Sequence, residues 1–303
     1  MRIKILIIAF CLLLAGSPAF AAAGTSGAAF LKIGIGAREM AMGGAGGTLT
    51  GSAESAYWNP AALAGIKNIS IALAGNKWIA DITHEYISAA FRLGGVGVIG
   101  INAVLLQIPG IELRDASENP LGTKTGQNAA YSFSYAGKLS PALAVGVNIK
   151  MISQGLESYD KDYKATGFGA DAGFIYTSAD EKMALGAALQ NAGTAGSFST
   201  KADALPMNLK VSGSYKLLND RLLVAGTVNY LLADSMLTYG AGAEYCLSNM
   251  FYLRAGYGRQ NDIDKGLNAG FGIKFGSFGA DFSYTPLVTA FGESMKVSLS
   301  ANF

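Results

Sequence analysis

The sequence lacks a long apolar run beyond its first residues. The longest candidate, residues 93–106, has 14 residues and is interrupted by glycines. A membrane-spanning helix needs about 20 consecutive apolar residues. The sequence therefore predicts no helical membrane span after residue 23.

Charged residues are also scarce, at 15% of the chain, whereas soluble domains carry about 25%. Of the 23 lysines and arginines, Arg2 and Lys4 lie in a leader that contains no acid, so 21 basic residues remain against 21 acidic ones. A net charge of zero gives no basic surface for phosphates, so we expect no nucleic-acid partner.

Cysteine and histidine are nearly absent. Cys11 lies in the leader, which leaves Cys246 alone, and an intrachain disulfide is therefore excluded. One histidine, His84, and one cysteine are too few ligands for a zinc site. The chain has no G-x-S-x-G motif, and we expect His84 to lie at the surface near the outer end of a strand. The sequence predicts no catalytic residue, no metal and no cofactor, and hence no enzyme.

The first 23 residues have the pattern of a secretory signal. Arg2 and Lys4 precede the apolar run Ile5–Ala15, and Ala19–Ala21 or Ala21–Ala23 supplies a small-residue cleavage site. The sequence therefore predicts an exported chain whose mature form begins after Ala21 or Ala23.

From about residue 68 onward, apolar and polar residues alternate, which is typical of strands. At the end of the chain Met295, Val297 and Leu299 share one face, and Lys296 and Ser298 share the other. We predict an all-β fold, a transmembrane antiparallel β-barrel of about 14 strands with its apolar face toward lipid. An exported soluble β-sandwich stays open as an alternative. The expected strands are residues 68–78, 82–93, 96–108, 127–139, 142–154, 165–177, 182–192, 207–218, 221–232, 237–247, 250–260, 266–276, 278–287 and 293–303.

The length of each connection depends on whether it follows an even-numbered or an odd-numbered strand, counted in chain order. Those after even-numbered strands are short, whereas residues 109–126, 155–164 and 193–206 form long connections after odd-numbered strands. Outer-membrane barrels have short periplasmic turns and longer outer loops, so we expect both chain ends at the periplasmic side. Aromatic residues expected to contribute to an outer girdle are Trp78, Tyr86, Tyr239, Tyr257 and Tyr284.

Residues 24–67 precede the strands and are rich in glycine. We predict that they form an ordered hatch, or plug, inside the barrel of residues 68–303. Glycine permits close approach to the wall and positive φ, Asn59–Pro60 favours a turn with Asn59 extended, and Arg38 would need a carboxylate, for which Glu39 or Glu54 is a candidate. Packing alone and a direct role in ligand binding both remain open. The candidate hatch or ligand residues are Arg38, Gly43, Gly44, Tyr57, Trp58, Asn59 and Pro60.

Three stretches of this segment, residues 30–38, 42–45 and 55–63, resemble the PorV/PorQ family of outer-membrane proteins. That family belongs to the larger group of proteins that resemble FadL, the long-chain fatty-acid transporter. The terminal Phe303 likewise resembles the C-terminal signature of outer-membrane barrels. The resemblance implies a fourteen-stranded barrel with an N-terminal hatch in the outer membrane of a Gram-negative-type bacterium, in contact with outer-membrane lipid. It further implies binding or passage of hydrophobic small molecules or, alternatively, a type IX-like secretion component that receives secreted protein cargo.

Overall fold

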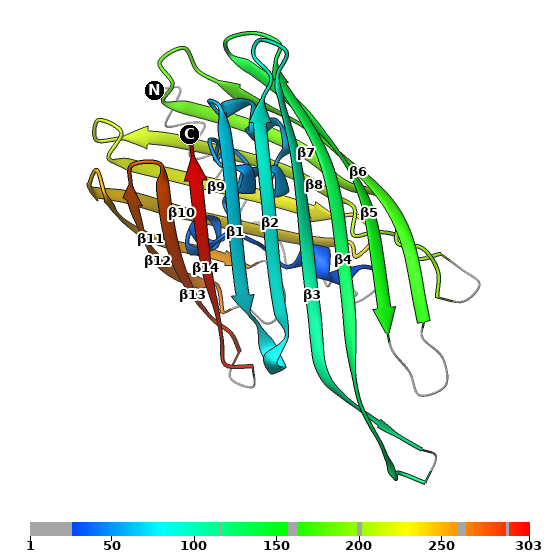
Figure 1. Ribbon diagram of the computed structural model, residues 1–303. Coiled ribbons are helices and arrows are strands. Elements are labelled where there is room, and N and C mark those ends of the chain that lie inside the picture. The colour runs from blue at the N-terminus through cyan, green and yellow to red at the C-terminus, as the bar shows by residue number, and fades with distance from the viewer. Residues whose placement is uncertain (1–25, 116, 157–162, 199–201, 260–264, 289–290) are drawn as a thin grey trace.

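Fourteen antiparallel strands close into a barrel in the computed structural model (Figure 1). The structure describes residues 26–115, 117–156, 163–198, 202–259, 265–288 and 291–303, so the predicted signal at residues 1–23 lies outside the described residues. The first strand pairs with the last, from Ser70 opposite Asn302 to Lys77 opposite Met295. Closure removes the unpaired strand edges that an open sheet would expose to lipid.

The predicted strand order and number are confirmed, with most strand ends within a few residues of the expected positions. The strands are β1 Ile69–Lys77, β2 Thr83–Arg92, β3 Val98–Arg114, β4 Pro120–Lys138, β5 Leu143–Leu156, β6 Tyr163–Thr177, β7 Met183–Thr194, β8 Asn208–Leu217, β9 Leu222–Leu231, β10 Met236–Ser248, β11 Phe251–Arg259, β12 Leu267–Phe275, β13 Phe278–Pro286 and β14 Glu293–Asn302.

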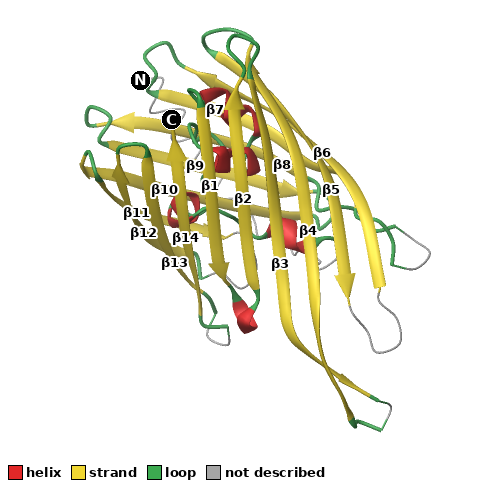
Figure 2. Cartoon of the chain, in the orientation of Figure 1, coloured by secondary structure: helices red, strands yellow, loops and turns green. Residues whose placement is uncertain are grey.

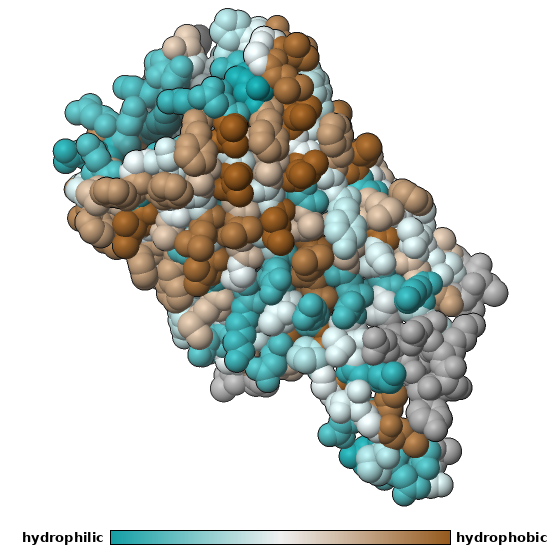
Figure 3. Space-filling model, in the orientation of Figure 1, coloured by the Kyte–Doolittle hydropathy of each residue, from teal (hydrophilic) through white to brown (hydrophobic). Residues whose placement is uncertain are grey.

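The alternation sorts side chains between the outside and the inside of the barrel. In β14, Met295, Val297 and Leu299 are exposed, whereas Lys296 and Ser298 are buried. Brown apolar side chains gather over the strand wall in Figure 3. An apolar exterior around a closed barrel is stable only in lipid. The chain is therefore a transmembrane β-barrel of the outer-membrane type.

No helix in the described part of the chain is both long enough and apolar enough to cross a membrane.

The prediction of a long loop at residues 109–126 is wrong, because most of these residues belong to β3 and β4. After a bulge between Ile108 and Ile111 the ladder of β3 and β4 resumes, with Ile111 opposite Lys124. Pro109 and Gly110 suggested a strand end, but a bulge absorbs both residues, with Gly110 at φ 70°. The resulting hairpin extends beyond the other strands, at the end away from the C-terminus (Figure 1).

The N-terminal segment, defined here as residues 26–68, runs inside the barrel as short helices joined by turns (Figure 2). Its helix η3 contacts β3 to β6, while α2 contacts β11 to β14 on the opposite side. The segment thus crosses the lumen between two parts of the wall. Its helices are η1 Ala29–Lys32, α2 Ala37–Ala41, η2 Ala53–Tyr57 and η3 Pro60–Gly65; a further helix, η4 Ile79–Asp81, connects β1 and β2.

Two sequence interpretations of β2 are wrong. His84, expected at the surface, is only 2% exposed, and Tyr86, expected in the aromatic girdle, is 1% exposed. The strand period places both on the inner face, together with Ser88. Tyr257 and Tyr284 do face outward, at 50% and 40% exposure.

Candidate functional site

Asn59 anchors the N-terminal segment to the wall. Its backbone is extended, at φ −160° and ψ 118°, and its Oδ1 accepts from the Ala61 amide to cap η3, with Pro60 at the first helical position. The Asn59 side-chain amide donates to Gly47 O at 3.2 Å within the segment and to Phe174 O of β6 at 3.1 Å. A β-carbon at wall residue Gly173 would overlap the Asn59 side chain. A glycine in the wall therefore makes the room that this contact needs.

Tyr57 and Trp58 precede this anchor and pack edge to face, with ring centroids 5.5 Å apart. The Tyr57 hydroxyl lies 2.9 Å from Leu31 O and 2.8 Å from Ile33 O, which ties η2 to the start of the segment. Burial raises the pKa of Tyr57, so the hydroxyl keeps its proton and can donate it. The Lys210 ammonium lies 4.6 Å from the Trp58 ring centroid and donates to Trp58 O at 3.3 Å.

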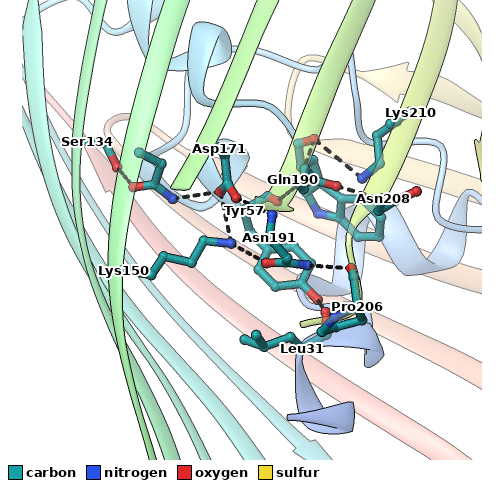
Figure 4. Close-up of polar contacts among 12 residues, drawn as sticks. Leu31, Tyr57, Ser134, Lys150, Asp171, Gln190, Asn191, Pro206, Asn208 and Lys210 are labelled. Carbon is teal, nitrogen blue, oxygen red and sulfur yellow. Dashed lines mark hydrogen bonds and ion pairs between the residues drawn. The ribbon is translucent and has the colours of Figure 1, made fainter. Parts of the chain in front are cut away.

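A polar network on the inner wall lies beside these residues (Figure 4). Lys150 Nζ lies 2.9 Å from Asp171 Oδ2 and donates to Asn191 Oδ1 at 2.6 Å. Asp171 also accepts from the Asn191 backbone amide at 2.7 Å and from Asn148 Nδ2 at 3.0 Å. Between this network and Tyr57 and Trp58 the structure leaves a cavity of only about 50 Å³.

This network was not predicted from the sequence. Asn191 sits at φ 57°, beside a register shift between β6 and β7 that follows Ala170. Such a bulge re-aims the side chains around it. The available signal was a pair of oppositely charged residues, Lys150 and Asp171, at inward positions of strands that are adjacent in the barrel.

A buried apolar cluster fills the lumen near the end with the longer connections, and we call the space that it fills the apolar chamber. Inward side chains of the wall meet apolar side chains of the N-terminal segment there, and all of them are buried. The wall contributes Tyr86, Val104, Leu106, Ala130 and Ile152, and the segment contributes Phe30, Leu31, Ile33 and Ile35. The chamber is therefore filled by the chain's own residues.

Arg38 does not pair with either carboxylate proposed from the sequence. Its Nη2 lies 2.7 Å from Glu244 Oε1 and its Nε donates to Glu244 Oε2 at 2.8 Å. Arg254 Nε binds the same Oε2 at 2.6 Å, and its Nη1 reaches Asp281 Oδ1 at 2.7 Å. Because Glu244 lies on β10, 206 residues from Arg38, nothing local in the sequence indicated this pair.

Gly43 and Gly44 follow α2 and adopt φ of 71° and 80°. A β-carbon on Gly43 would lie 2.7 Å from Tyr257 O in β11. Across this contact, Gly242 and Gly256 of the wall would meet the backbone of Met42 in the same way. Glycine on both sides lets two backbones pack against each other here.

A second and larger space lies on the other side of the segment, at the barrel end that carries the short turns. It has a volume of about 460 Å³, and Gly276 and Ser277 of the β12–β13 turn line its mouth. Arg38, Glu39 and Glu54 line its inner end. We call it the short-turn chamber. The N-terminal segment therefore separates a polar, open chamber from an apolar, filled one.

Comparisons with known proteins support the fold. No family model matches the sequence, and no curated protein matches it at a significant level. Among solved structures, the toluene transporter TodX of Pseudomonas putida superposes with a TM-score of 0.65 at 14% identity, over 89% of this chain and 98% of that one. The toluene transporter TbuX of Ralstonia pickettii gives 0.60 at 16% identity, again over 89% and 98%. A FadL homologue of Pseudomonas aeruginosa gives 0.61 at 12% identity, over the same shares.

These three structural neighbours are thus two toluene transporters and a FadL homologue. At these identities the likeness establishes the barrel architecture over most of both chains. A shared fold does not define a function, which depends on the residues inside the barrel.

Proposed function

We propose that this chain is a non-enzymatic conduit for hydrophobic small molecules in the outer membrane, with residues 24–67 acting as its hatch. The observation that carries the proposal is the apolar chamber. The interior of an outer-membrane barrel is ordinarily polar, yet Val104, Leu106 and Ile152 point inward and are buried. A wall of this kind suits an apolar ligand, which would replace Phe30 and its neighbours.

The hatch must move for a molecule to pass. Ligand pockets usually measure about 300–1,000 Å³, whereas only about 50 Å³ is available beside Tyr57 and Trp58. The contacts of Asn59 with β6 and of Arg38 with Glu244 hold the hatch closed. A ligand would enter the apolar chamber from outside, displace the segment and leave through the short-turn chamber or sideways through the wall.

A disulfide between hatch and wall tests this proposal. A β-carbon on Gly47 would lie 2.8 Å from Ser212 Cβ of β8, so small shifts would bring Gly47→Cys and Ser212→Cys to disulfide spacing. The variant would carry Cys246→Ser, since Cys246 is the free cysteine of the described residues. Uptake of radiolabelled toluene and oleic acid by cells expressing the protein would be measured before and after reduction.

We expect oxidation to abolish uptake above the empty-vector rate and reduction to restore it. The matched control joins two wall strands on the outer face of the barrel instead, through Leu185→Cys and Gly213→Cys, which lie directly opposite each other on β7 and β8. That disulfide should leave uptake unchanged. Equal uptake by the oxidised and reduced Gly47–Ser212 variant would rule out hatch movement as the gate.

A second candidate function is reception of secreted protein cargo, as a PorV/PorQ-type component of a type IX-like machine. The resemblance of residues 30–63 supports it, and so does the hairpin of β3 and β4, which reaches past the rest of the barrel. Deleting residues 109–126 would remove the projecting part of that hairpin. Loss of cargo attachment with normal toluene uptake would favour this second function, and the converse would favour the conduit.

A further inference from the structure

Two buried carboxyl groups of the hatch face each other at the inner end of the short-turn chamber. Glu39 of α2 is 2% exposed and Glu54 of η2 is 4% exposed. A β-carbon placed on Gly36 would lie under 3.0 Å from Glu39 Oε2 and from Glu54 Oε1. The two carboxyl groups therefore converge on one point beside the Gly36 α-carbon. Gly36 itself has a positive φ of 79°.

The hydrogen bonds of this pair are incomplete. Glu54 Oε1 accepts from Ser298 Oγ of β14 at 3.0 Å, and the same hydroxyl accepts from the Ala37 amide at 2.9 Å. Glu39 Oε2 is buried and has no hydrogen-bond partner among the described residues. A buried carboxylate oxygen without a partner is costly, and it marks a place where a positive group is missing.

The surrounding charges do not supply that positive group. Arg38 and Arg254 are engaged by Glu244 and Asp281. The lining at the inner end of the chamber thus has four carboxyl groups and two guanidinium groups, which is an excess of two negative charges when all are ionised. The buried Lys296 of β14 is not part of this lining and donates to Ser294 Oγ at 3.0 Å. Two further lysines line the chamber, Lys67 and Lys274, but they are exposed to solvent near its mouth.

The geometry points to a binding site for one hydrated divalent cation between Glu39 and Glu54, reached through the short-turn chamber. Magnesium is commonly held by one or two carboxylates while it keeps several waters. Glu39, Glu54 and the Ser298 hydroxyl supply such a set, and a chamber of about 460 Å³ has room for the waters. This site does not rest on the conduit proposal, because its ligands are Glu39, Glu54 and Ser298, whether or not the chamber is an exit for a transported molecule.

The cation would replace protons on the pair. Burial raises the pKa of Glu39, and burial together with the neighbouring Glu39 carboxyl raises the pKa of Glu54 well above its usual range. Since a ligating carboxylate has to lose its proton, binding should strengthen as pH rises. The bound ion would couple α2, η2 and β14, and would thereby fix the hatch to the wall from the short-turn side.

Titration with Mn²⁺ followed by electron paramagnetic resonance tests the site. The mature chain would be refolded in detergent without lipopolysaccharide, which itself binds divalent ions. We expect one bound Mn²⁺ per chain that excess Mg²⁺ displaces. Glu39→Gln and Glu54→Gln should each weaken binding by about tenfold or more, because each removes a negative ligand while keeping its shape.

Glu112→Gln is the matched control, because it removes one carboxylate from the exposed part of the β3–β4 hairpin. It should leave Mn²⁺ binding unchanged. Heat-dependent migration in electrophoresis would verify that each variant is folded. Absence of bound Mn²⁺ at millimolar concentration would overturn the proposal and leave a pair that shares protons. Equal binding by the Glu39→Gln/Glu54→Gln double variant would overturn it too, and would place the ion elsewhere on the chain.

Discussion

Arg38 and Glu244 form a two-point ion pair between the N-terminal segment and β10, with Nη2 and Oε1 2.7 Å apart and Nε and Oε2 2.8 Å apart. Planar guanidinium and carboxylate groups that meet in this way fix orientation as well as distance. Because Arg254 binds the same carboxylate from β11, Glu244 stays paired even if Arg38 is lost. Loss of the Arg38 contact would therefore leave no isolated charge on the wall.

Replacing Arg38 with methionine should release α2 from the wall while the barrel stays folded. Loss of the charge-assisted hydrogen bonds should lower the free energy of local opening by about 1–2 kcal/mol. Hydrogen exchange of residues 37–45 would measure this as faster exchange. Lys77→Met is the control, because it removes an exposed ion pair with Asp81 in the β1–β2 connection. Unchanged exchange in Arg38→Met would show that other contacts hold α2.

Asn59→Asp should detach η3 from the barrel wall. The substitution keeps the Oδ1 atom that caps Ala61 but replaces the amide donor by an acceptor facing Gly47 O and Phe174 O. Unpaired buried acceptors cost about 1–3 kcal/mol each. Limited proteolysis should then cut within residues 45–66, most of which are buried in the parent protein. The same change at the exposed Asn119, Asn119→Asp, should leave the digestion pattern unaltered.

Alanine substitutions at two glycines with positive φ can distinguish the energetic cost of backbone strain from the cost of a steric clash with the wall. Gly43 has φ 71° and its β-carbon would meet Tyr257 O, whereas Gly51 has φ 91° and open space around it. Gly51→Ala should therefore show only the strain, about 1 kcal/mol. Gly43→Ala should cost clearly more, because the wall backbone cannot yield. Guanidinium unfolding in detergent would compare the two, and equal losses would argue against the backbone contact.

Stability in EDTA should fall as pH rises, because of Glu39 and Glu54. Their pKa values are raised in the folded chain, so the folded state binds more protons than the unfolded state above the ordinary value of 4.5. The free energy of unfolding then decreases with pH from about that point upward until both groups ionise. Unfolding midpoints between pH 5 and 9 would show this slope. The Glu39→Gln/Glu54→Gln double variant should show a flatter profile, and an identical slope would assign the effect to other groups.

The barrel was largely readable from the chain because strand alternation is a local property. Met295 through Leu299 already show which face is apolar, and the same period in β2 would have placed His84 and Tyr86 inside had it been applied there. The projecting hairpin was missed for a related reason. A proline followed by a glycine usually ends a strand. Only the pairing of Ile111 with Lys124 shows that Pro109 and Gly110 form a bulge here.

Arg38, Trp58 and Asn59 of the N-terminal segment were singled out from the sequence, but the residues that they contact could not be predicted from it. Asn59 was expected to be extended before Pro60, and its backbone is so. Its contacts with Gly47 and Phe174 depend on a barrel that brings distant strands together. Likewise, the sequence did not indicate that the Trp58 ring lies against Lys210 or that its Nε1 has no hydrogen-bond partner among the described residues.

By itself, the sequence determined the strands, their approximate ends and the faces that meet lipid, because each depends on the order of neighbouring residues. Tertiary structure alone decided that Arg38 meets Glu244, that Glu39 meets Glu54 and that Phe30 fills the apolar chamber. Closure of the barrel sets these contacts. It brings residues more than 200 positions apart within hydrogen-bond distance, and no local pattern records which of many inward side chains will meet.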